Sequence, residues 1–128
     1  MPGCTISTIT PSFLKLIVEK ADELKVDISC LKRAQVGAEY LPPAIRSAMR
    51  SRGIAVTQMY GSADMGLIAY ESLNPDGSLN EGMIMEEGLL LEIVRPGSGD
   101  PVPDGEVGEV VLTSFNRDYP LIRFATGD

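Results

Sequence analysis

The 128-residue sequence contains no histidine, only two cysteines and no long apolar run. Without histidine, these residues hold neither a Ser-His-Asp or Cys-His catalytic group nor a histidine-ligated metal site. Cys4 and Cys30 lack the C-x-x-C spacing of zinc and redox sites and the density of a disulfide scaffold, so we expect structural thiols. The apolar runs fall far short of the ~20 residues of a membrane span, and no signal-peptide pattern is present. The sequence therefore predicts a cytoplasmic protein without a membrane partner.

Basic side chains are scarce in the second half of the sequence. Residues 61–128 contain 3 basic and 13 acidic side chains, whereas residues 1–60 contain 8 basic and 5 acidic ones, and the formal net charge is −7. Nucleic-acid binding needs clustered Lys and Arg, so we expect no nucleic-acid partner. With 44% hydrophobic residues, the chain is long enough to bury a core without disulfides or metals, which predicts a folded globular domain.

The first sixty residues alternate between helical and strand patterns. Thr10 and Pro11 are typical of a helix N-terminus, while Pro42 is placed to open a second helix and Gly53 to end it. The predicted elements are a helix from residue 10, a strand at 32–36, a helix from residue 42 and a strand at 54–59. The predicted apolar faces are Leu14, Ile17, Val18, Ala21 and Leu24 in the first helix, and Leu41, Ile45, Ala48 and Met49 in the second.

This alternation predicts an α/β fold with a parallel sheet, in which ligands gather at the carboxyl ends of the strands. Gly37 and Gly61 follow two such ends. Beyond them lie short strand candidates at 67–71, 83–86, 89–94 and 109–115, separated by turn sequences rich in Pro, Asp and Gly. These strands predict an antiparallel sheet or partial β-barrel. We therefore divide the chain into an α/β portion, residues 1–66, and a β-rich portion, residues 67–128.

The segment from Tyr60 to Gly66 has the residue types of a nucleotide site. Glycine lets backbone approach a phosphate, the Tyr60 ring can stack on a base, and Asp64 can hold a magnesium ion. The same residues also suit a strand-to-helix turn in which Tyr60 packs in the core and Asp64 caps the next element. No Walker or Rossmann glycine motif occurs in the sequence, so those two modes of nucleotide binding are excluded.

Four segments, taken in order, are more specific than any one alone. They are Gly37-Ala38-Glu39 with Leu41-Pro42-Pro43; Gln58 to Gly66; Gly105 to Thr113; and Pro120 to Arg123 with Thr126-Gly127-Asp128. This order resembles the adenylate-forming acyl-CoA synthetase superfamily, and most closely its phenylacetate-CoA ligase branch, from about Ile9 to Asp128. Enzymes of that family use ATP to convert a carboxylic acid to an acyl-adenylate and then pass the acyl group to coenzyme A. The resemblance therefore implies ATP or AMP, Mg²⁺ and coenzyme A as cofactors, with an aryl or aryl-acetic acid as substrate.

The resemblance also implies roles for individual residues. The loop of Gly37, Ala38 and Glu39 would lie along the adenine, Tyr60 would stack on it, and Gly61 would allow close approach. Asp128 would bind the ribose hydroxyls.

The family motif Tyr-Gly-x-[Thr/Ser]-Glu places its hydroxyl on the α-phosphate and its glutamate near magnesium. In this sequence those positions are Ala63 and Asp64, which depart from the pattern. Alanine has no hydroxyl to donate and aspartate is one methylene shorter than glutamate. Ser62 is the neighbouring residue that would supply a hydroxyl instead.

The resemblance implies that the chain is an internal fragment of a longer enzyme, because the family's phosphate loop and its C-terminal lysine domain are not in the sequence. Such groups stabilise phosphoryl charge, so we expect the chain alone to form no acyl-CoA. Two alternatives to part of a ligase are a nucleotide-binding or regulatory module without catalysis, and a structural domain that binds nothing. Unpaired sheet edges also predict a homodimer.

Overall fold

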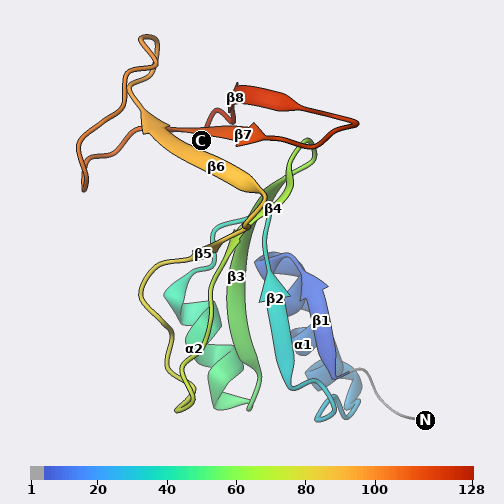
Figure 1. Cartoon of the computed structure of the whole chain (residues 1–128). Helices are drawn as coiled ribbons and strands as arrows, with labels where there is room; N and C mark the ends of the chain where they lie inside the picture. Colours follow the sequence, from blue (N-terminus) through green and yellow to red (C-terminus); the bar gives the residue numbers. More distant parts are fainter. Residues whose placement is uncertain (1–4) are drawn as a thin grey trace. The chain divides into compact units, whose positions relative to one another are not determined.

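The computed structural model of the protein describes residues 5–128 and contains two compact units (Figure 1). The first unit ends at Ile84, and the second runs from Met85 to Asp128. The first holds both helices, and the second holds a three-stranded sheet. The division that we expected near residue 66, where helical patterns give way to strand patterns, lies within the first unit. The reason is that the strand at 66–70 pairs with the strand at 55–62. Cys4 lies outside the described residues, and Cys30 carries a free, half-buried thiol.

The larger sheet combines parallel and antiparallel strands in the order β1-β2-β3-β4-β5. Its strands are β1 (Ile6–Ile9), β2 (Arg33–Val36), β3 (Ala55–Ser62), β4 (Gly66–Tyr70) and β5 (Ile84–Met85). Strands β1, β2 and β3 are parallel, and β4 is antiparallel to β3. The predicted parallel sheet is confirmed, but β1 was not anticipated, because four residues with alternating exposure carry little signal without their partner strand.

The two helices connect the parallel strands. Helix α1 (Pro11–Leu24) begins as predicted, with the Thr10 Oγ1 accepting a hydrogen bond from the Phe13 backbone N at 3.4 Å. Helix α2 (Pro43–Ser51) begins one residue later than expected, with Pro42 as its N-cap. Both helices therefore start at proline, which has no N–H to leave unsatisfied in the first turn.

The core of the first unit is formed by both helices together with β2 and β3 and the loops beside them. It consists of Leu14, Val18, Leu31, Ala34, Val36, Leu41, Met49, Ile54 and Val56. The predicted helix faces were too wide: Ile17 and Leu24 are 44% and 68% exposed, and Ala48 is exposed. Each helix buries only the stripe that meets the sheet, and this stripe is narrower than the run of apolar residues in the sequence.

The second unit is an open, antiparallel, three-stranded sheet in the order β6-β7-β8. Strands β6 (Leu89–Val94) and β7 (Glu109–Ser114) match the predicted strands, whereas β8 (Leu121–Ala125) was not predicted. The register of β7 against β8 shifts between Leu112 and Ser114. The predicted succession of an α/β portion and an antiparallel sheet is confirmed.

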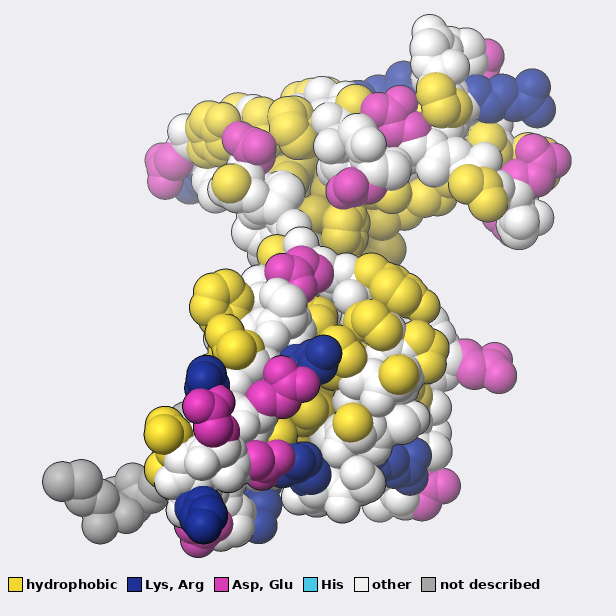
Figure 2. Space-filling view, turned by 180° about the vertical axis from the view of Figure 1, so that it is seen from behind, with side chains coloured by type: hydrophobic (Ala, Val, Ile, Leu, Met, Phe, Trp, Pro, Cys, Tyr) yellow, Lys and Arg dark blue, Asp and Glu magenta, His cyan; other side chains and the backbone are white. Residues whose placement is uncertain are grey.

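Exposed apolar side chains occur on the surfaces of both units, as the yellow atoms in Figure 2 show. Phe13 on α1 is 59% exposed, and Phe115 just after β7 is 72% exposed. Within residues 5–128, neither helix is long and apolar enough to span a bilayer.

Candidate functional site

A cleft of about 600 Å³ lies where β1, β2 and β3 end. Its lining comes from three segments of the first unit: Thr8, Ile9 and Thr10; Gly37 and Ala38; and Met59, Gly61, Ser62, Ala63, Gly66 and Leu67. Because parallel strands present their carboxyl ends at one edge of a sheet, segments distant in sequence meet there. The cleft thus occupies the place in the fold where the sequence predicted a ligand.

Gly37 follows β2 directly and is buried against β3. Its backbone N donates a hydrogen bond to the Ile9 carbonyl at 3.3 Å. A Cβ atom at this position would lie 2.9 Å from the Met59 Cγ and 3.1 Å from the Met59 carbonyl oxygen. Only glycine lets the loop after β2 pass this close to β3, so Gly37 sets the shape of this wall of the cleft.

Ala38 continues this wall, and Glu39 follows it in the chain. Ala38 has a φ of 62°, in the left-handed region that a non-glycine residue seldom adopts. The Glu39 carboxylate does not line the cleft; it accepts hydrogen bonds from Ser12 in the first turn of α1, from the backbone N at 3.1 Å and from Oγ at 2.8 Å. The structure therefore brings Gly37 and Ala38 into the cleft and directs the Glu39 side chain toward α1.

The hairpin of β3 and β4 forms another wall of the cleft, next to Gly37. A Cβ atom on Gly61 would lie 2.6 Å from the Gly66 carbonyl oxygen, and the register of the hairpin shifts between Tyr60 and Gly61. Met59 and Gly61 line the cleft, but the half-buried Tyr60 between them does not. Successive side chains of a strand point to opposite faces, which separates Tyr60 from its two neighbours.

The tip of this hairpin carries the segment from Ser62 to Asp64. The Ser62 Oγ accepts a hydrogen bond from the Met65 backbone N at 3.1 Å, which closes the turn. Ala63 is exposed and lines the cleft, and Asp64 beside it is exposed. The turn leads into an antiparallel strand, so the interpretation of this segment as a strand-to-helix turn is wrong.

Asp128 belongs to the second unit. Its backbone N donates to the Thr126 Oγ1 at 3.3 Å, and its carbonyl accepts from the Val110 backbone N at 3.1 Å. The Thr126 hydroxyl donates in turn to the Val110 carbonyl at 3.0 Å. Thr126, Gly127 and Asp128 are thus held on β7 by hydrogen bonds.

The cleft is chemically neutral, since all of its lining residues are uncharged. Backbone amides, two threonines and a serine supply its polar groups, and Ile9, Met59 and Leu67 supply apolar surface. Such a lining suits a flat, neutral ring system that is held by a few hydrogen bonds. Over residues 5–128, no three acidic or cysteine side chains gather closely enough to hold a metal ion.

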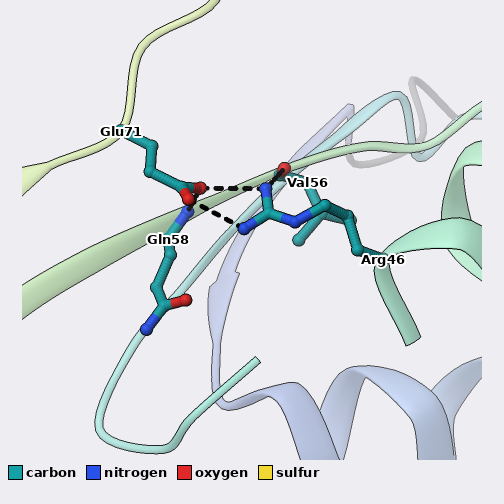
Figure 3. A network of polar contacts seen from close by, with 4 residues as sticks. All are labelled: Arg46, Val56, Gln58 and Glu71. Atoms are coloured by element: carbon teal, nitrogen blue, oxygen red, sulfur yellow. Dashed lines mark hydrogen bonds and ion pairs between the residues drawn. The ribbon is translucent and has the colours of Figure 1, made fainter. Parts of the chain in front are cut away.

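A polar network missed by the sequence analysis anchors the base of the hairpin (Figure 3). Arg46 on α2 binds both carboxylate oxygens of Glu71, at 2.9 and 2.8 Å, and donates to the Val56 carbonyl at 2.9 Å. Glu71 also accepts from the Gln58 backbone N at 2.6 Å. The two side chains are only 24% and 16% exposed. Arg46 and Glu71 are 25 residues apart in the sequence, so no local pattern indicates that they pair.

The sequence of the chain is similar to those of known nucleotide-using enzymes. The model of the AMP-binding enzyme family matches residues 2–116. Phenylacetate-coenzyme A ligase of Escherichia coli strain K12 is 38% identical over 128 residues, covering 94% of this chain and 28% of that protein. The enzyme of the same name from Aromatoleum evansii is 33% identical, covering 96% of this chain and 29% of that protein. The chain therefore spans less than a third of the length of these relatives.

Solved structures show the same fold. An open conformation of 2-hydroxyisobutyryl-CoA ligase, in complex with 2-HIB-AMP and CoA, superposes with a TM-score of 0.80 at 24% identity, covering 97% of this chain and 30% of that one. An anthranilate CoA ligase in complex with anthranoyl-AMP gives a TM-score of 0.70 at 26% identity, covering 91% and 22%. The family match, which extends over most of the sequence, and these shared folds lead to one conclusion: the chain belongs to the family of AMP-binding enzymes.

Proposed function

We propose that this chain supplies the adenine-binding part of an ATP-dependent carboxylic acid:CoA ligase of the phenylacetate-CoA ligase type. The reaction would join an aryl or aryl-acetic acid to AMP with release of pyrophosphate, and then transfer the acyl group to the thiol of CoA. The observation that carries the proposal is the neutral cleft at the ends of β1, β2 and β3, walled by Gly37, Ala38 and Gly61. Membership of the AMP-binding family supports the same assignment.

In this proposal the nucleotide lies along the main chain of Gly37 and Ala38. The absence of a Cβ on Gly37 and on Gly61 supports it indirectly, because it lets Gly37 pack against Met59 and Gly61 against Gly66, and this close packing shapes the walls that the nucleotide meets. Tyr60 does not line the cleft, so we propose that the adenine extends beyond the lining residues to the Tyr60 ring and stacks on it there. We also propose that the Asp128 carboxylate binds the ribose hydroxyls. The hydrogen bonds that hold Thr126 and Asp128 on β7 would keep that carboxylate in a defined place.

The phosphate and metal roles fall to Ser62, Ala63 and Asp64. Ala63 lines the cleft without a hydroxyl, so Ser62 is proposed as the donor to the α-phosphate; its hydroxyl retains a proton to donate while it accepts from Met65. Asp64 is exposed and offers one carboxylate to Mg²⁺. A single carboxylate fits this ion when phosphate oxygens and waters complete its octahedron. Bound there, Mg²⁺ would neutralise phosphate charge.

The charge of the chain bears on its expected activity and on its partners. The cleft lining carries no positive charge, so we expect this chain by itself to form no acyl-CoA, because phosphoryl transfer depends on such charge. A net charge of −7 favours small-molecule partners over nucleic acid. We further propose a homodimer and a cytoplasmic location, the first to be tested by light scattering.

Calorimetric titration with AMP and with a nonhydrolysable phenylacetyl-adenylate analogue, with and without Mg²⁺, tests the proposed function. We expect the analogue to bind, and binding to weaken about tenfold in Tyr60→Ala, because stacking on a base contributes about 1–3 kcal/mol. Asp128→Ala should weaken binding similarly. Matched controls are Tyr119→Ala, whose ring is 57% exposed, and Asp118→Ala, also exposed. Equal affinity in Tyr60→Ala, Asp128→Ala and the controls would contradict the proposed residue roles.

A gain-of-function variant tests the phosphate position. Ala63→Ser places a hydroxyl in the cleft lining at the position where the family has one. We expect the adenylate analogue to bind about 3- to 10-fold more tightly, the effect of one added hydrogen bond. AMP, which keeps the phosphate, should show the same gain, whereas adenosine should not. A gain that adenosine shares would contradict the assignment.

A further inference from the structure

Two walls of the cleft are joined by side chains that lie just outside it. Ala38 on one wall precedes Glu39, and Thr10 on another is two residues before Ser12. Glu39 and Ser12 bind each other, and the Ser12 Oγ lies 3.2 Å from the Thr10 Oγ1. A continuous polar connection therefore links the loop after β2 to the start of α1, across 27 residues of sequence.

The start of α1 makes this connection favourable. The first N–H groups of a helix have no acceptor within the helix, and proline at position 11 has no N–H to satisfy. Phe13 donates to the Thr10 side chain, and Leu14 donates to the Thr10 carbonyl. The Ser12 N–H is left for the Glu39 carboxylate, whose negative charge also suits the positive end of the helix dipole.

The residue before Glu39 needs such a restraint. At φ 62°, Ala38 lies in the left-handed region, where a residue with a Cβ is strained relative to the ordinary helical or extended regions. A strained residue on an exposed loop keeps its conformation only where its neighbours are held. Gly37 is held on one side by its hydrogen bond to Ile9, and Glu39 is held on the other by Ser12.

We infer that Glu39 is a positioning residue, whose carboxylate, bound to Ser12, holds Ala38 in its left-handed conformation and so fixes the wall of the cleft that receives the nucleotide. This inference rests on the proposed function, but it assigns Glu39 a different role from direct contact with the adenine. The two roles predict different behaviour when Ser12 is changed. A direct contact is indifferent to Ser12, whereas a positioning contact is weakened in Ser12→Ala, which removes the Oγ hydrogen bond and leaves the one from the backbone N.

A double-mutant cycle separates the two roles. Titration of the adenylate analogue into Ser12→Ala and Glu39→Ala should show affinities reduced about 3- to 10-fold in each, because each removes at least one hydrogen bond. The double variant should bind no more weakly than Glu39→Ala, since both changes break one connection. Glu39→Gln keeps acceptor oxygen and should restore most of the affinity. Glu23→Ala, a glutamate of α1 paired with Lys20 at the surface, is the matched control and should bind normally.

A glycine substitution at position 38 tests whether Glu39 acts by holding the backbone of Ala38 at positive φ. In the Glu39→Ala background, Ala38→Gly should recover affinity, because glycine adopts positive φ without strain. Thermal unfolding of each variant reports whether it is folded. Additive losses in the double cycle, or an unaffected Ser12→Ala beside a weakened Glu39→Ala, would overturn the inference and indicate direct contact.

Amide hydrogen exchange tests, without any ligand, whether Glu39 and Ser12 restrain the loop at residues 37–40. Exchange at residues 37–40 should be about 3- to 10-fold faster in Ser12→Ala and Glu39→Ala, and unchanged in Glu23→Ala. Unchanged exchange in the first two variants would overturn the inference. Failure of the unsubstituted chain to bind the adenylate analogue would instead count against the proposed function, and exchange would still decide whether Glu39 restrains Ala38.

Discussion

The two compact units bury their side chains in different ways. In the first, α1 and α2 pack with β2 and β3 around one core, so each element has a buried side. In the second, the buried side chains are Val94, Val111, Leu112 and Thr113, all from β6 and β7. The second unit also leaves Leu90, Val107, Phe115, Tyr119 and Ile122 more than half exposed. A sheet needs a second layer to bury a face, and only the first unit supplies one from its own helices.

This difference indicates where stability and function lie. The cleft belongs wholly to the first unit, whose core holds the strands that end at it. The second unit contributes Asp128 on a sheet with few buried residues. We therefore expect the first unit to unfold cooperatively and the second to open at a lower free energy, which hydrogen exchange can resolve.

The largest expected effect is the loss of a core leucine from the first unit. Leu14→Ala removes a side chain that is 1% exposed and leaves a cavity between α1 and the sheet, so the free energy of unfolding should fall by about 3 kcal/mol. Urea denaturation measures the loss. Leu16→Ala, on the same helix but 47% exposed, should change stability by less than about 0.5 kcal/mol. Similar losses in the two variants would show that α1 is not packed as described.

The ion pairs of the two units allow a direct comparison. Glu71→Ala leaves the Gln58 N–H without its acceptor and Arg46 with only the Val56 carbonyl, in a largely buried place, so we expect a loss of about 2 kcal/mol. Glu92→Ala breaks the 3.1 Å pair with Arg123, which is 51% exposed, and should cost about 0.5 kcal/mol. Chemical denaturation gives both values. Equal losses would contradict the idea that burial distinguishes the two pairs.

A substitution at the cleft should couple stability to binding. Gly61→Ala would place a Cβ 2.6 Å from the Gly66 carbonyl, which must shift, so we expect a loss of about 1–2 kcal/mol together with weaker binding of the adenylate analogue. Gly88→Ala is the control, since its Cβ would meet nothing within 4 Å. Thermal unfolding and calorimetry on both variants make the comparison. Unaltered binding in Gly61→Ala would argue against this wall as part of the site.

The smallest expected effect concerns pH. A hydrogen bond from Arg52 lowers the pKa of Asp22 below its usual 3.8. Hydrogen bonds donated by Ser29 lower the pKa of Asp27, and those donated by Ser78 lower the pKa of Asp76. Because the folded-state pKa is depressed, each carboxylate stabilises the first unit above pH 3.8, and this stabilisation is lost as pH falls through the folded-state value. The Tm difference between wild type and Asp22→Asn should therefore shrink between pH 5 and pH 3. A constant difference would exclude Asp22 as a contributor.

Local patterns predicted the regular elements well, for identifiable reasons. Thr10 and Pro11 mark the start of α1 because capping needs only adjacent residues. The strand at 89–94 was predicted to the residue, since its apolar run is bounded by glycine and proline. Strands β1 and β8 were not predicted, because each depends on hydrogen bonds to a partner that lies at least seven residues away.

For the residues in and beside the cleft, too, some features could be predicted from local sequence and others depend on distant partners. Gly37 and Gly61 were predicted from sequence, and both prove to be positions where a Cβ would collide with main chain or Met59. The orientation of Tyr60 away from the cleft lining depends on the pleat and register of the hairpin. The Glu39 carboxylate finds Ser12 only once β1 and β2 pair in parallel.

The sequence by itself determined the order of the elements from α1 to β7, the parallel pairing expected of β2 and β3 and the glycines of the cleft, because these follow from spacing and residue type along the chain. The order of its motifs also carried the resemblance to the family. Tertiary structure alone decided the outer strands β1 and β8, the pairing of Arg46 with Glu71 and the restraint of Ala38 through Glu39. These features join residues that are 25 or more positions apart, or strands whose edges must meet. Their partners are chosen by how the sheet pairs and packs, which no local pattern records.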